Sequence, residues 1–429
     1  MEALFSSLVS GASLRGRILD TIAEAAGLSA AKHVDLHVMA FVFTDEVLAD
    51  ALADAAARRP WLTVRILADW RTRTQQVGRL AKLALPNLIV RYSRDQPYVW
   101  DGGRLRWSYL TSRGLLHHKT LAVLVDGRPL RLICGSFNWT ATAAKSYENL
   151  VVVSADAEAD TELMARMELE FEALWSDGRT SLAPDEAQAH YDALLKAFHA
   201  DPALEPAAVV GLAQGRGEPL AALDQAYRPA GREAFDRAVA IAFSCRGADP
   251  AARRGAAATN RAQRFVLRSP FGALKPVPLT LTHLALDTIF RAVPGDTLKI
   301  AMYGLSPRVP EYGALIQAAR RGVRLFVLLD RAVGSGTVKR LAEARAGEGL
   351  PIEIRAASRM MHNKYIVHVD QATVLTGTAN LSTDATARHF EHRLRVHGRR
   401  DFAERFEADF DVVWSRLRPE PVFAPQTVP

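Results

Sequence analysis

The chain carries the same short sequence signature twice, once in each half, and this repeat constrains its fold more than any other feature. The first copy is His117-His118-Lys119, then Gly135-Ser136-Phe137-Asn138, then Glu148. The second copy is His362-Asn363-Lys364, then Gly377-Thr378-Ala379-Asn380, then Glu391. Each copy leads into an acidic, apolar stretch with a shared ending, Phe171-x3-Trp175-Ser176 and Phe410-x3-Trp414-Ser415. The repeat predicts two halves of similar structure.

The residue types in the signature suit the cleavage of a phosphodiester. A neutral imidazole is a good nucleophile, and covalent catalysis divides a difficult displacement into two easier steps. A second imidazole can protonate the leaving oxygen near neutral pH. Lysine ammonium groups and asparagine amides stabilise charge on the phosphoryl oxygens. A carboxylate behind an imidazole fixes its tautomer and stabilises its protonated form.

The spacing of the signature predicts which side chains face the reaction. His117 and Lys119 begin a predicted strand and point to the same face, because strand side chains alternate with a period of two. His118 therefore points to the opposite face, which favours a structural role. The same argument places His362 and Lys364 together and Asn363 opposite. The Gly that begins each later segment permits a close approach of the backbone.

Both copies resemble the phospholipase D superfamily, in which His-x-Lys is followed by Gly-Ser/Thr-x-Asn and then by Glu. The resemblance covers roughly residues 30–176 and 280–417. One position departs from the family pattern: the Asp that follows the Lys is replaced by Leu124 and Val369. The nearest acids, Asp126 and Asp370, are interpreted as turn residues at hairpin tips. The departure weakens assignment to a particular branch more than it weakens the assignment of catalysis.

The resemblance implies a fold and a site. We expect two α/β lobes, each a mixed β-sheet flanked by helices, related by a pseudo-twofold axis that passes through one active site. A single chain then suffices for activity. The implied catalytic residues are His117, Lys119, Asn138, Glu148, His362, Lys364, Asn380 and Glu391. Ser136 and Thr378 are candidate substrate-binding residues, or alternatively helix caps.

Roles within the site follow from the same resemblance. His117 is expected to be the nucleophile and His362 the general acid. We expect no metal and no cofactor, because the signature offers no cluster of carboxylates that would hold a metal pair.

The chain outside the signature alternates predicted strands and helices, which is typical of α/β proteins. Predicted strands are 33–43, 62–69, 88–92, 119–125, 130–134, 149–153, 297–305, 323–330, 352–355, 365–369, 373–375 and 392–396. Predicted helices are 45–59, 157–175, 185–200, 309–321, 338–346 and 401–414. We assign an N-terminal lobe to 1–178, a connector to 179–278, a C-terminal lobe to 279–420 and a tail to 421–429.

The composition indicates which partners and which cellular location to expect. The net charge of +7 favours anionic partners such as nucleic acid or phospholipid headgroups. Cys134 lies in an apolar run and is expected in the core, and two cysteines do not make a disulfide framework. The first residues do not form a secretory signal, and no apolar run is long enough to span a membrane. A cytoplasmic location fits these features best.

Two substrate classes remain open from the sequence. A nuclease is favoured by the basic charge and by the first signature, which resembles the small bacterial endonucleases of the family. Its nucleic acid would be held by arginines such as Arg71 and Arg73, by the patch 253–268, and by interleaved aromatic and basic residues in 98–109. The alternative is a phospholipase D or a cardiolipin synthase-like phosphatidyl hydrolase or transferase acting on membrane lipid.

Overall fold

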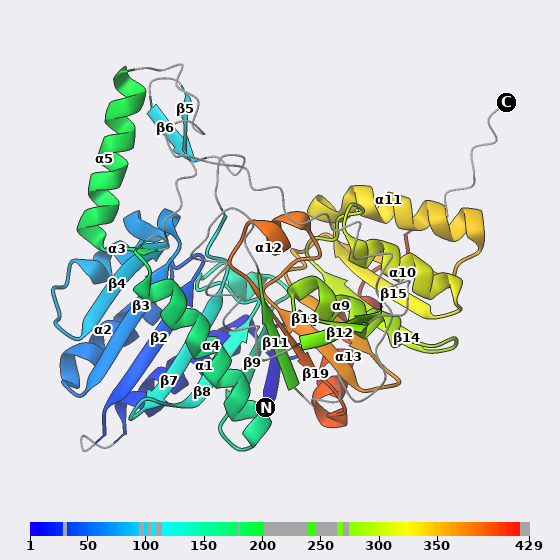
Figure 1. The fold of residues 1–429 in the computed structure, drawn as a ribbon, viewed down its shortest axis with the longest axis horizontal. Coiled ribbons are helices and arrows are strands. Elements are labelled where there is room, and N and C mark those ends of the chain that lie inside the picture. The colour runs from blue at the N-terminus through cyan, green and yellow to red at the C-terminus, as the bar shows by residue number, and fades with distance from the viewer. Residues whose placement is uncertain are drawn as a thin grey trace.

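The computed structural model describes residues 1–28, 32–93, 98–101, 104–107, 114–178, 181–200, 239–244, 264–268 and 274–420. Two α/β lobes lie side by side (Figure 1). In the N-terminal lobe an eight-stranded mixed sheet has the order β1-β9-β8-β7-β2-β3-β4-β10. These strands are Glu2–Phe5, Asn149–Ser154, Arg128–Gly135, Lys119–Val125, Val34–Ala40, Leu62–Ala68, Leu88–Ser93 and Ser181–Leu182, in sheet order. The helices are α1 (Gly11–Ala26), α2 (Glu46–Arg58), α3 (Gln76–Ala81), α4 (Glu158–Ser176) and α5 (Pro184–Ala200), with short 3₁₀ turns at Trp70–Thr74 and Ala143–Lys145.

The C-terminal lobe repeats this plan in a seven-stranded sheet with the order β11-β19-β18-β17-β14-β15-β16. In sheet order the strands are Val239–Phe243, His392–Val396, Thr373–Gly377, Lys364–His368, Thr297–Met302, Arg324–Asp330 and Ile352–Ala357. The helices are α9 (Leu281–Phe290), α10 (Pro310–Arg320), α11 (Arg331–Glu348), α12 (Thr383–Ala387) and α13 (Arg400–Ser415). Two small hairpins, β5 (Tyr98–Asp101) with β6 (Arg104–Trp107) and β12 (Arg264–Arg268) with β13 (Leu274–Pro278), lie outside the sheets.

Local sequence signals explain these elements. Asp45 caps α2 by accepting the amide of Leu48, and the helix begins with Glu46 and ends with Arg58, as the helix dipole favours. Asp126 and Gly127 both adopt positive φ, of 51° and 74°, in the tight turn between β7 and β8. Asp370 lies in the matching turn before β18, where it accepts the amide of Thr297. Both acids are therefore turn residues.

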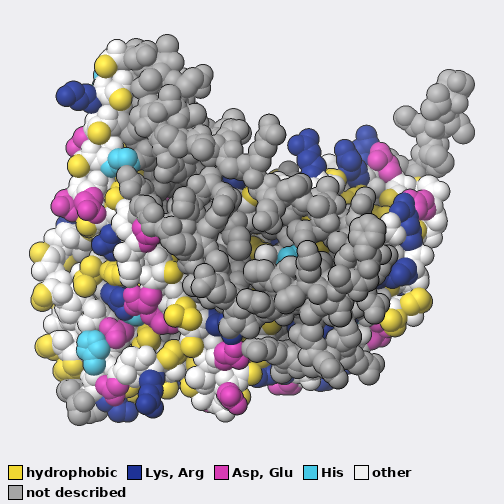
Figure 2. All heavy atoms as spheres, viewed as in Figure 1, with side chains coloured by type: hydrophobic (Ala, Val, Ile, Leu, Met, Phe, Trp, Pro, Cys, Tyr) yellow, Lys and Arg dark blue, Asp and Glu magenta, His cyan; other side chains and the backbone are white. Residues whose placement is uncertain are grey.

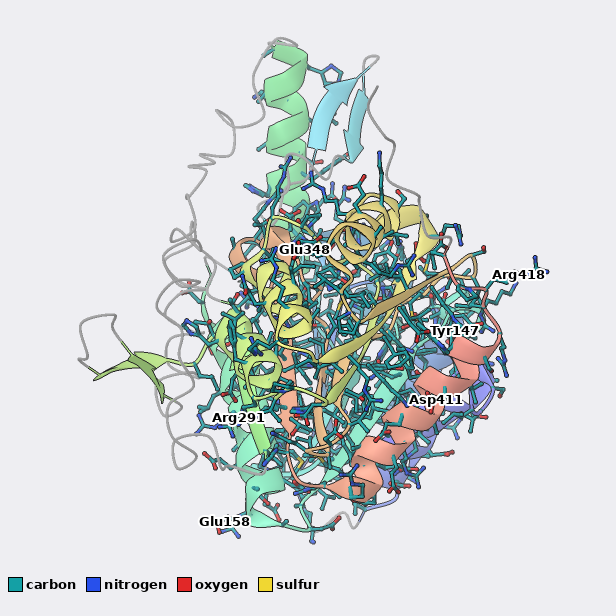
Figure 3. The ribbon with its side chains drawn as sticks, turned by 90° about the vertical axis from the view of Figure 1, so that its right-hand side faces the viewer. Tyr147, Glu158, Arg291, Glu348, Asp411 and Arg418 are labelled. Carbon is teal, nitrogen blue, oxygen red and sulfur yellow. The ribbon has the colours of Figure 1, made fainter. Side chains whose placement is uncertain are left out.

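The buried hydrophobic residues form three layers. The outer face of the N-terminal sheet packs on α1, α2 and α3, and the outer face of the C-terminal sheet packs on α9, α10 and α11. The inner faces of both sheets share a single core with α4 and α13, and this core includes the buried Cys134. Figure 3 faces the C-terminal lobe and shows α13, on which Asp411 is labelled; this helix contacts β1 of the first lobe as well as β17 and β18. The lobes are therefore joined by a continuous core.

One strand of the C-terminal sheet comes from the segment that we assigned to the connector. β11 pairs antiparallel with β19 along its full length, from Val239 to Phe243. It occupies the place that β1 takes beside β9 in the first lobe. The connector therefore supplies an edge strand, and its helix α5, predicted at 185–200, projects from the first lobe beside the β5–β6 hairpin (Figure 1).

The surface that the structure describes bears charges of both signs. Figure 2 shows Lys and Arg side chains intermixed with Asp and Glu over the described part of one face. Within the described residues, no helix has the length and apolarity needed to cross a bilayer. The side chains of the arginine patch in 253–268 and of the aromatic cluster in 98–109 lie outside what the structure describes.

Candidate active site

The two signature histidines each bond to the glutamate of the opposite half. The Nδ1 atom of His117 lies 2.9 Å from a carboxylate oxygen of Glu391, and the Nδ1 atom of His362 lies 2.8 Å from Glu148. All four side chains are almost fully buried. The structure thus brings both copies of the signature into one site within a single chain, and neither half completes it alone.

Short backbone bridges between the lobes produce this crossed pairing. In one bridge the amide of His117 donates to the carbonyl of Phe390, and the amide of Phe390 donates to the carbonyl of Leu115. Leu116 and Phe390 form a parallel β-bridge there. Because Phe390 directly precedes Glu391, the bridge brings that carboxylate alongside the imidazole of His117.

The second bridge repeats this arrangement with the halves exchanged. The amide of His362 donates to the carbonyl of Tyr147, which is labelled in Figure 3, and the amide of Tyr147 donates to Met360. Tyr147 directly precedes Glu148, so this bridge delivers the other carboxylate to His362.

The two lysines also follow the repeat. The Nζ atom of Lys119 donates to the carbonyl of His117 at 2.7 Å, and Lys364 bonds the carbonyl of His362 at the same distance. Lys119 lies 4.8 Å from the ring centroid of Phe41, and Lys364 lies 5.3 Å from that of Tyr303. These cation–π contacts restrict the ammonium groups to the site.

The candidate substrate-binding hydroxyls bond to the glutamates. Ser136 donates to Glu148 at 2.6 Å and accepts the amide of Asn149. Thr378 bonds Glu391 and accepts the amide of His392. Both hydroxyl residues are fully buried. Their contacts therefore support a role in orienting the carboxylates behind the imidazoles.

A glycine before each hydroxyl residue permits this geometry. Gly135 has φ of 148° and Gly377 has φ of 136°, which side chains rarely adopt. A Cβ at Gly135 would lie 2.4 Å from the carbonyl oxygen of Asn149, and one at Gly377 would lie 2.4 Å from that of His392. Any larger residue would push the Ser or Thr segment away from the glutamate.

The two signature asparagines lie in different environments. Asn380 accepts the amide of Gly304 at 3.1 Å through its side-chain oxygen, and its backbone carbonyl accepts from Arg393. Arg393 is buried and pairs with Glu311 at 3.1 Å. Asn138 belongs to a segment that the backbone of Val42 and Thr44 holds through Trp139. Both asparagine side chains are partly exposed, as substrate contact requires.

Burial and positive charge together lower the pKa of both imidazoles. Burial lowers the pKa of His117 well below its ordinary value, and the nearby Lys119 and Lys364 lower it further. Burial also lowers the pKa of His362, although Glu148 opposes this shift. The pKa of Lys364 falls to about 8, mainly through burial. Lys119 and Lys364 each lower the pKa of both His117 and His362, so the four groups share one electrostatic environment.

Several functional neighbours carried no sequence signal. Ser6 and Ser244 hold the two glutamate segments: each hydroxyl accepts the amide of the glutamate, Glu148 or Glu391, and donates to the carbonyl two residues before it. His389 lies 6.1 Å from His117 between ring centroids, and its Nδ1 accepts the amide of Leu115. Only the tertiary structure shows these contacts, because the bonded residues lie far apart in the sequence.

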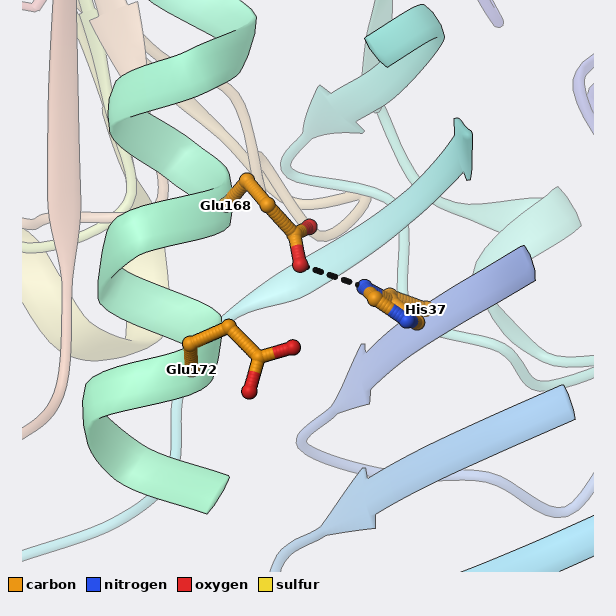
Figure 4. Close-up of side chains that lie close together, drawn as sticks. All are labelled: His37, Glu168 and Glu172. Carbon is orange, nitrogen blue, oxygen red and sulfur yellow. Dashed lines mark ion pairs between the residues drawn. The ribbon is translucent and has the colours of Figure 1, made fainter. Parts of the chain in front are cut away.

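A second cluster of ionisable residues lies away from the site, between the sheet and α4 (Figure 4). His37 pairs with Glu168 at 2.7 Å through Nδ1, and its Nε2 accepts from Arg65 at 2.8 Å. Arg65 also bonds Glu172 at 2.6 Å. The guanidinium supplies the positive charge that the carboxylates require. The cluster is therefore an ion-pair network that anchors α4 to the sheet.

Fold and site together define a two-lobed α/β protein with a paired His-Lys-Asn-Glu site. Residues 22–175 and 286–414 match the family model described as the phospholipase D-like domain of cardiolipin synthase. The chain belongs to the phospholipase D superfamily, whose members are phosphodiesterases.

Named relatives agree with this membership. The chain is 28% identical over 134 residues to a phospholipase D of Rickettsia felis, which covers 31% of this chain and 64% of the relative. It is 29% identical over 105 residues to a phospholipase D of Rickettsia prowazekii, covering 24% of this chain and 50% of the relative. The match thus spans less than two thirds of these relatives.

A solved structure shares the fold across both lobes. Phosphatidylserine synthase of Haemophilus influenzae superposes with a TM-score of 0.58 at 12% identity. The superposition covers 97% of this chain and 87% of the synthase. This likeness supports the two-lobed architecture with a pseudo-twofold axis.

Proposed function

We propose that this protein cleaves the phosphodiester of a phospholipid through a covalent phosphohistidine and passes the phosphatidyl group to water or an alcohol. The observation that carries the proposal is the crossed bonding of each imidazole Nδ1 to a glutamate. This bonding fixes the tautomer, so Nε2 is the ring nitrogen that reacts.

His117 is the proposed nucleophile. All the neighbouring charges that shift its pKa lower it, whereas Glu148 supports a proton on His362. In the first step Nε2 of His117 forms a bond to phosphorus and the bond from phosphorus to the leaving oxygen breaks. His362, protonated on both ring nitrogens, gives that oxygen the proton of its Nε2. In the second step water or an alcohol attacks phosphorus, His362 takes its proton, and the bond to His117 breaks.

The lysines and asparagines balance the charge of the reacting group. Burial lowers the pKa of both Lys119 and Lys364, and Lys364 lowers that of Lys119 further. Glu148 and Glu391 oppose these shifts. An anionic phosphodiester relieves this repulsion and favours both ammonium groups. Asn138 and Asn380 are proposed to donate to the phosphoryl oxygens. In this mechanism Glu148 and Glu391 orient the imidazoles, and the two lysines supply the positive charge that balances the phosphoryl group.

The comparisons favour lipid as the substrate class. The matching family model is described by cardiolipin synthase, and both relatives are named phospholipase D. Nucleic acid, which the first signature and the net charge of +7 favour, is the alternative. Both substrates present the same diester, so an experiment must separate them.

The test supplies purified protein with anionic phospholipid vesicles, single- and double-stranded DNA, and RNA, all in EDTA. We expect lipid headgroup release, and phosphatidylethanol when ethanol is added, because an alcohol can intercept the phosphohistidine. His117→Ala should abolish both products, and mass spectrometry of quenched wild-type protein should find the modification on His117. Cleavage of nucleic acid alone, or activity that EDTA abolishes and magnesium restores, would contradict the proposal.

A further inference from the structure

Two buried aspartates at matching places in the lobes hold the segment in front of each signature histidine. Asp69 follows β3, and Asp330 ends β15. One carboxylate oxygen of Asp69 accepts the amide of Leu116 at 3.0 Å. One oxygen of Asp330 accepts the amide of Met361 at the same distance. Leu116 and Met361 are the residues directly before His117 and His362.

The second oxygen of each aspartate caps the helical turn that follows its strand. Asp69 accepts the amide of Arg71 at 3.1 Å, and Asp330 accepts the amides of Ala332 and Val333. A cap alone would explain this half of the arrangement. It does not explain the bond to a residue about 30 or more positions away in the sequence, made in both lobes.

These bonds complete the bridges that cross between the lobes. The amides of Leu116 and His117 point in opposite directions, as in any strand. The amide of His117 bonds Phe390 of the other lobe, and the amide of Leu116 bonds Asp69 of its own lobe. The segment is thereby held from both sides.

We propose that Asp69 and Asp330 are positioning residues that fix the register of the two interlobe bridges, and so align each catalytic histidine with the glutamate of the opposite half. Neither aspartate is proposed to touch the substrate. The inference rests on the proposed phosphohistidine chemistry for its kinetic consequence only, because the alignment itself can be observed without turnover.

Asparagine is the informative replacement. An amide group of the same shape keeps one acceptor oxygen but turns a donor toward the other amide, so it can serve the cap or the bridge and not both. Asp45 provides a matched control, because it is a buried aspartate that caps α2 through Leu48 and faces Arg15 at 3.5 Å. Its side chain contacts neither signature.

The experiment combines turnover with a direct observation of the imidazoles. Turnover is measured with bis(p-nitrophenyl) phosphate as kcat and KM. The Nδ1 protons of His117 and His362 are followed as downfield proton NMR resonances, assigned from the loss of each in His117→Ala and His362→Ala. Thermal unfolding of every variant reports the cost of the lost cap.

We expect Asp69→Asn to displace the resonance of His117 and leave that of His362 in place, and Asp330→Asn to do the reverse. Asp69→Asn should lower kcat by roughly ten- to a hundredfold with little change in KM, the cost of misplacing a catalytic group. Asp330→Asn should lower kcat less on this activated ester, because its leaving group needs no proton from His362. Asp45→Asn should lower the unfolding temperature to a similar extent and leave both resonances and kcat as in wild type.

Two results would overturn the inference. One is an unchanged pair of resonances in Asp69→Asn and Asp330→Asn. The other is an equal loss of kcat in Asp45→Asn, which would show that capping alone matters. A wild-type protein that shows both resonances but cleaves no diester would count against the proposed function and not against the positioning role.

Discussion

Each signature imidazole bonds a carboxylate from the opposite half of the chain. Glu391 supports His117, and Glu148 supports His362. Each glutamate therefore bonds the histidine of the other signature copy and not the histidine of its own copy. This exchange can be tested because the two histidines are proposed to have different roles.

Replacing either glutamate by glutamine should lower kcat on a lipid substrate by about 10²- to 10⁴-fold, since the protonated imidazole loses its counter-charge. With an activated nitrophenyl ester the leaving group needs no proton. Glu148→Gln should then resemble His362→Ala and keep measurable turnover, whereas Glu391→Gln should resemble His117→Ala and lose it.

Glu172→Gln is the control for this pair of variants, because Glu172 bonds Arg65 outside the site. The crossed assignment fails if Glu148→Gln behaves like His117→Ala on the activated ester.

The pH profile should be displaced from that of ordinary histidine and lysine residues. The pKa of His117 lies well below 6.5, so kcat/KM for bis(p-nitrophenyl) phosphate should show no fall as the pH drops through 6.5. The pKa of Lys364 is about 8, so kcat/KM should fall as the pH rises through that value and the ammonium loses its proton.

Lys364→Arg tests the alkaline limb, because a guanidinium keeps its charge throughout this range. Its profile should lose the fall near pH 8 that the deprotonation of Lys364 causes, even if the rate is lower. An acid limb centred near pH 6.5 in the wild type would contradict the assignment of His117.

At the scale of elements, the ends of the two edge strands hold the glutamates. Ser6 follows β1 and Ser244 follows β11. The Ser244 hydroxyl accepts the amide of Glu391 at 3.0 Å and donates to the carbonyl of His389 at 2.6 Å. β11 thus completes both the sheet and the site.

Ser244→Ala should lower the free energy of unfolding by about 1–3 kcal/mol, because it leaves a buried amide and carbonyl without their partner. It should also lower kcat, since Glu391 loses its backbone anchor, and Ser6→Ala should act in the same way through Glu148. Urea denaturation and turnover measure the two effects.

Ser382→Ala is the comparison variant, because Ser382 caps α12 through the amide of Ala385 and contacts neither glutamate. If it lowers kcat as much as Ser244→Ala, the anchor is not specific to the glutamate.

At the scale of the whole molecule, the lobes meet at a buried histidine pair behind the site. His118 and His392 stack at 5.2 Å between ring centroids, and their Nδ1 atoms are 2.9 Å apart. One ring must donate and the other accept, so the accepting ring must be neutral. Burial lowers the pKa of both, to about 3 for His392. Lys119 contributes to both shifts, and His392 contributes to that of His118.

Acid should therefore loosen the interface. The unfolded histidines take up protons near pH 6.5 and the folded ones do not, so stability falls as the pH drops below 6.5. Between pH 7.5 and 5.5 each residue should remove about 1.4 kcal/mol from the free energy of unfolding. Urea denaturation at the two pH values measures this.

The repeat suggests the control variant, because Asn363 in the second half corresponds to His118 and Asn149 in the first half corresponds to His392. Replacing both histidines by asparagine should reduce the pH dependence by about twice the single-residue amount. An unchanged dependence in that double variant would show that the pair is not responsible.

The sequence by itself determined the repeated α/β plan, the family and the two halves of one site. The period-two spacing of His117 and Lys119 was sufficient to place both on one face, and Asp126-Gly127 was sufficient to predict the turn. These features depend on local backbone geometry, which neighbouring residues dictate. For the same reason the strands and helices near the signatures were predicted close to their observed bounds.

Only the tertiary structure decided which glutamate serves which histidine, and which distant residues hold them. Glu391 lies 274 positions from His117, and Asp69 lies 47 positions from Leu116, so no spacing rule links them. Their pairing depends on how the two sheets pack around a shared core, which leaves no period in the sequence. The edge strand β11 escaped prediction for the same reason, because its place is set by its pairing with β19.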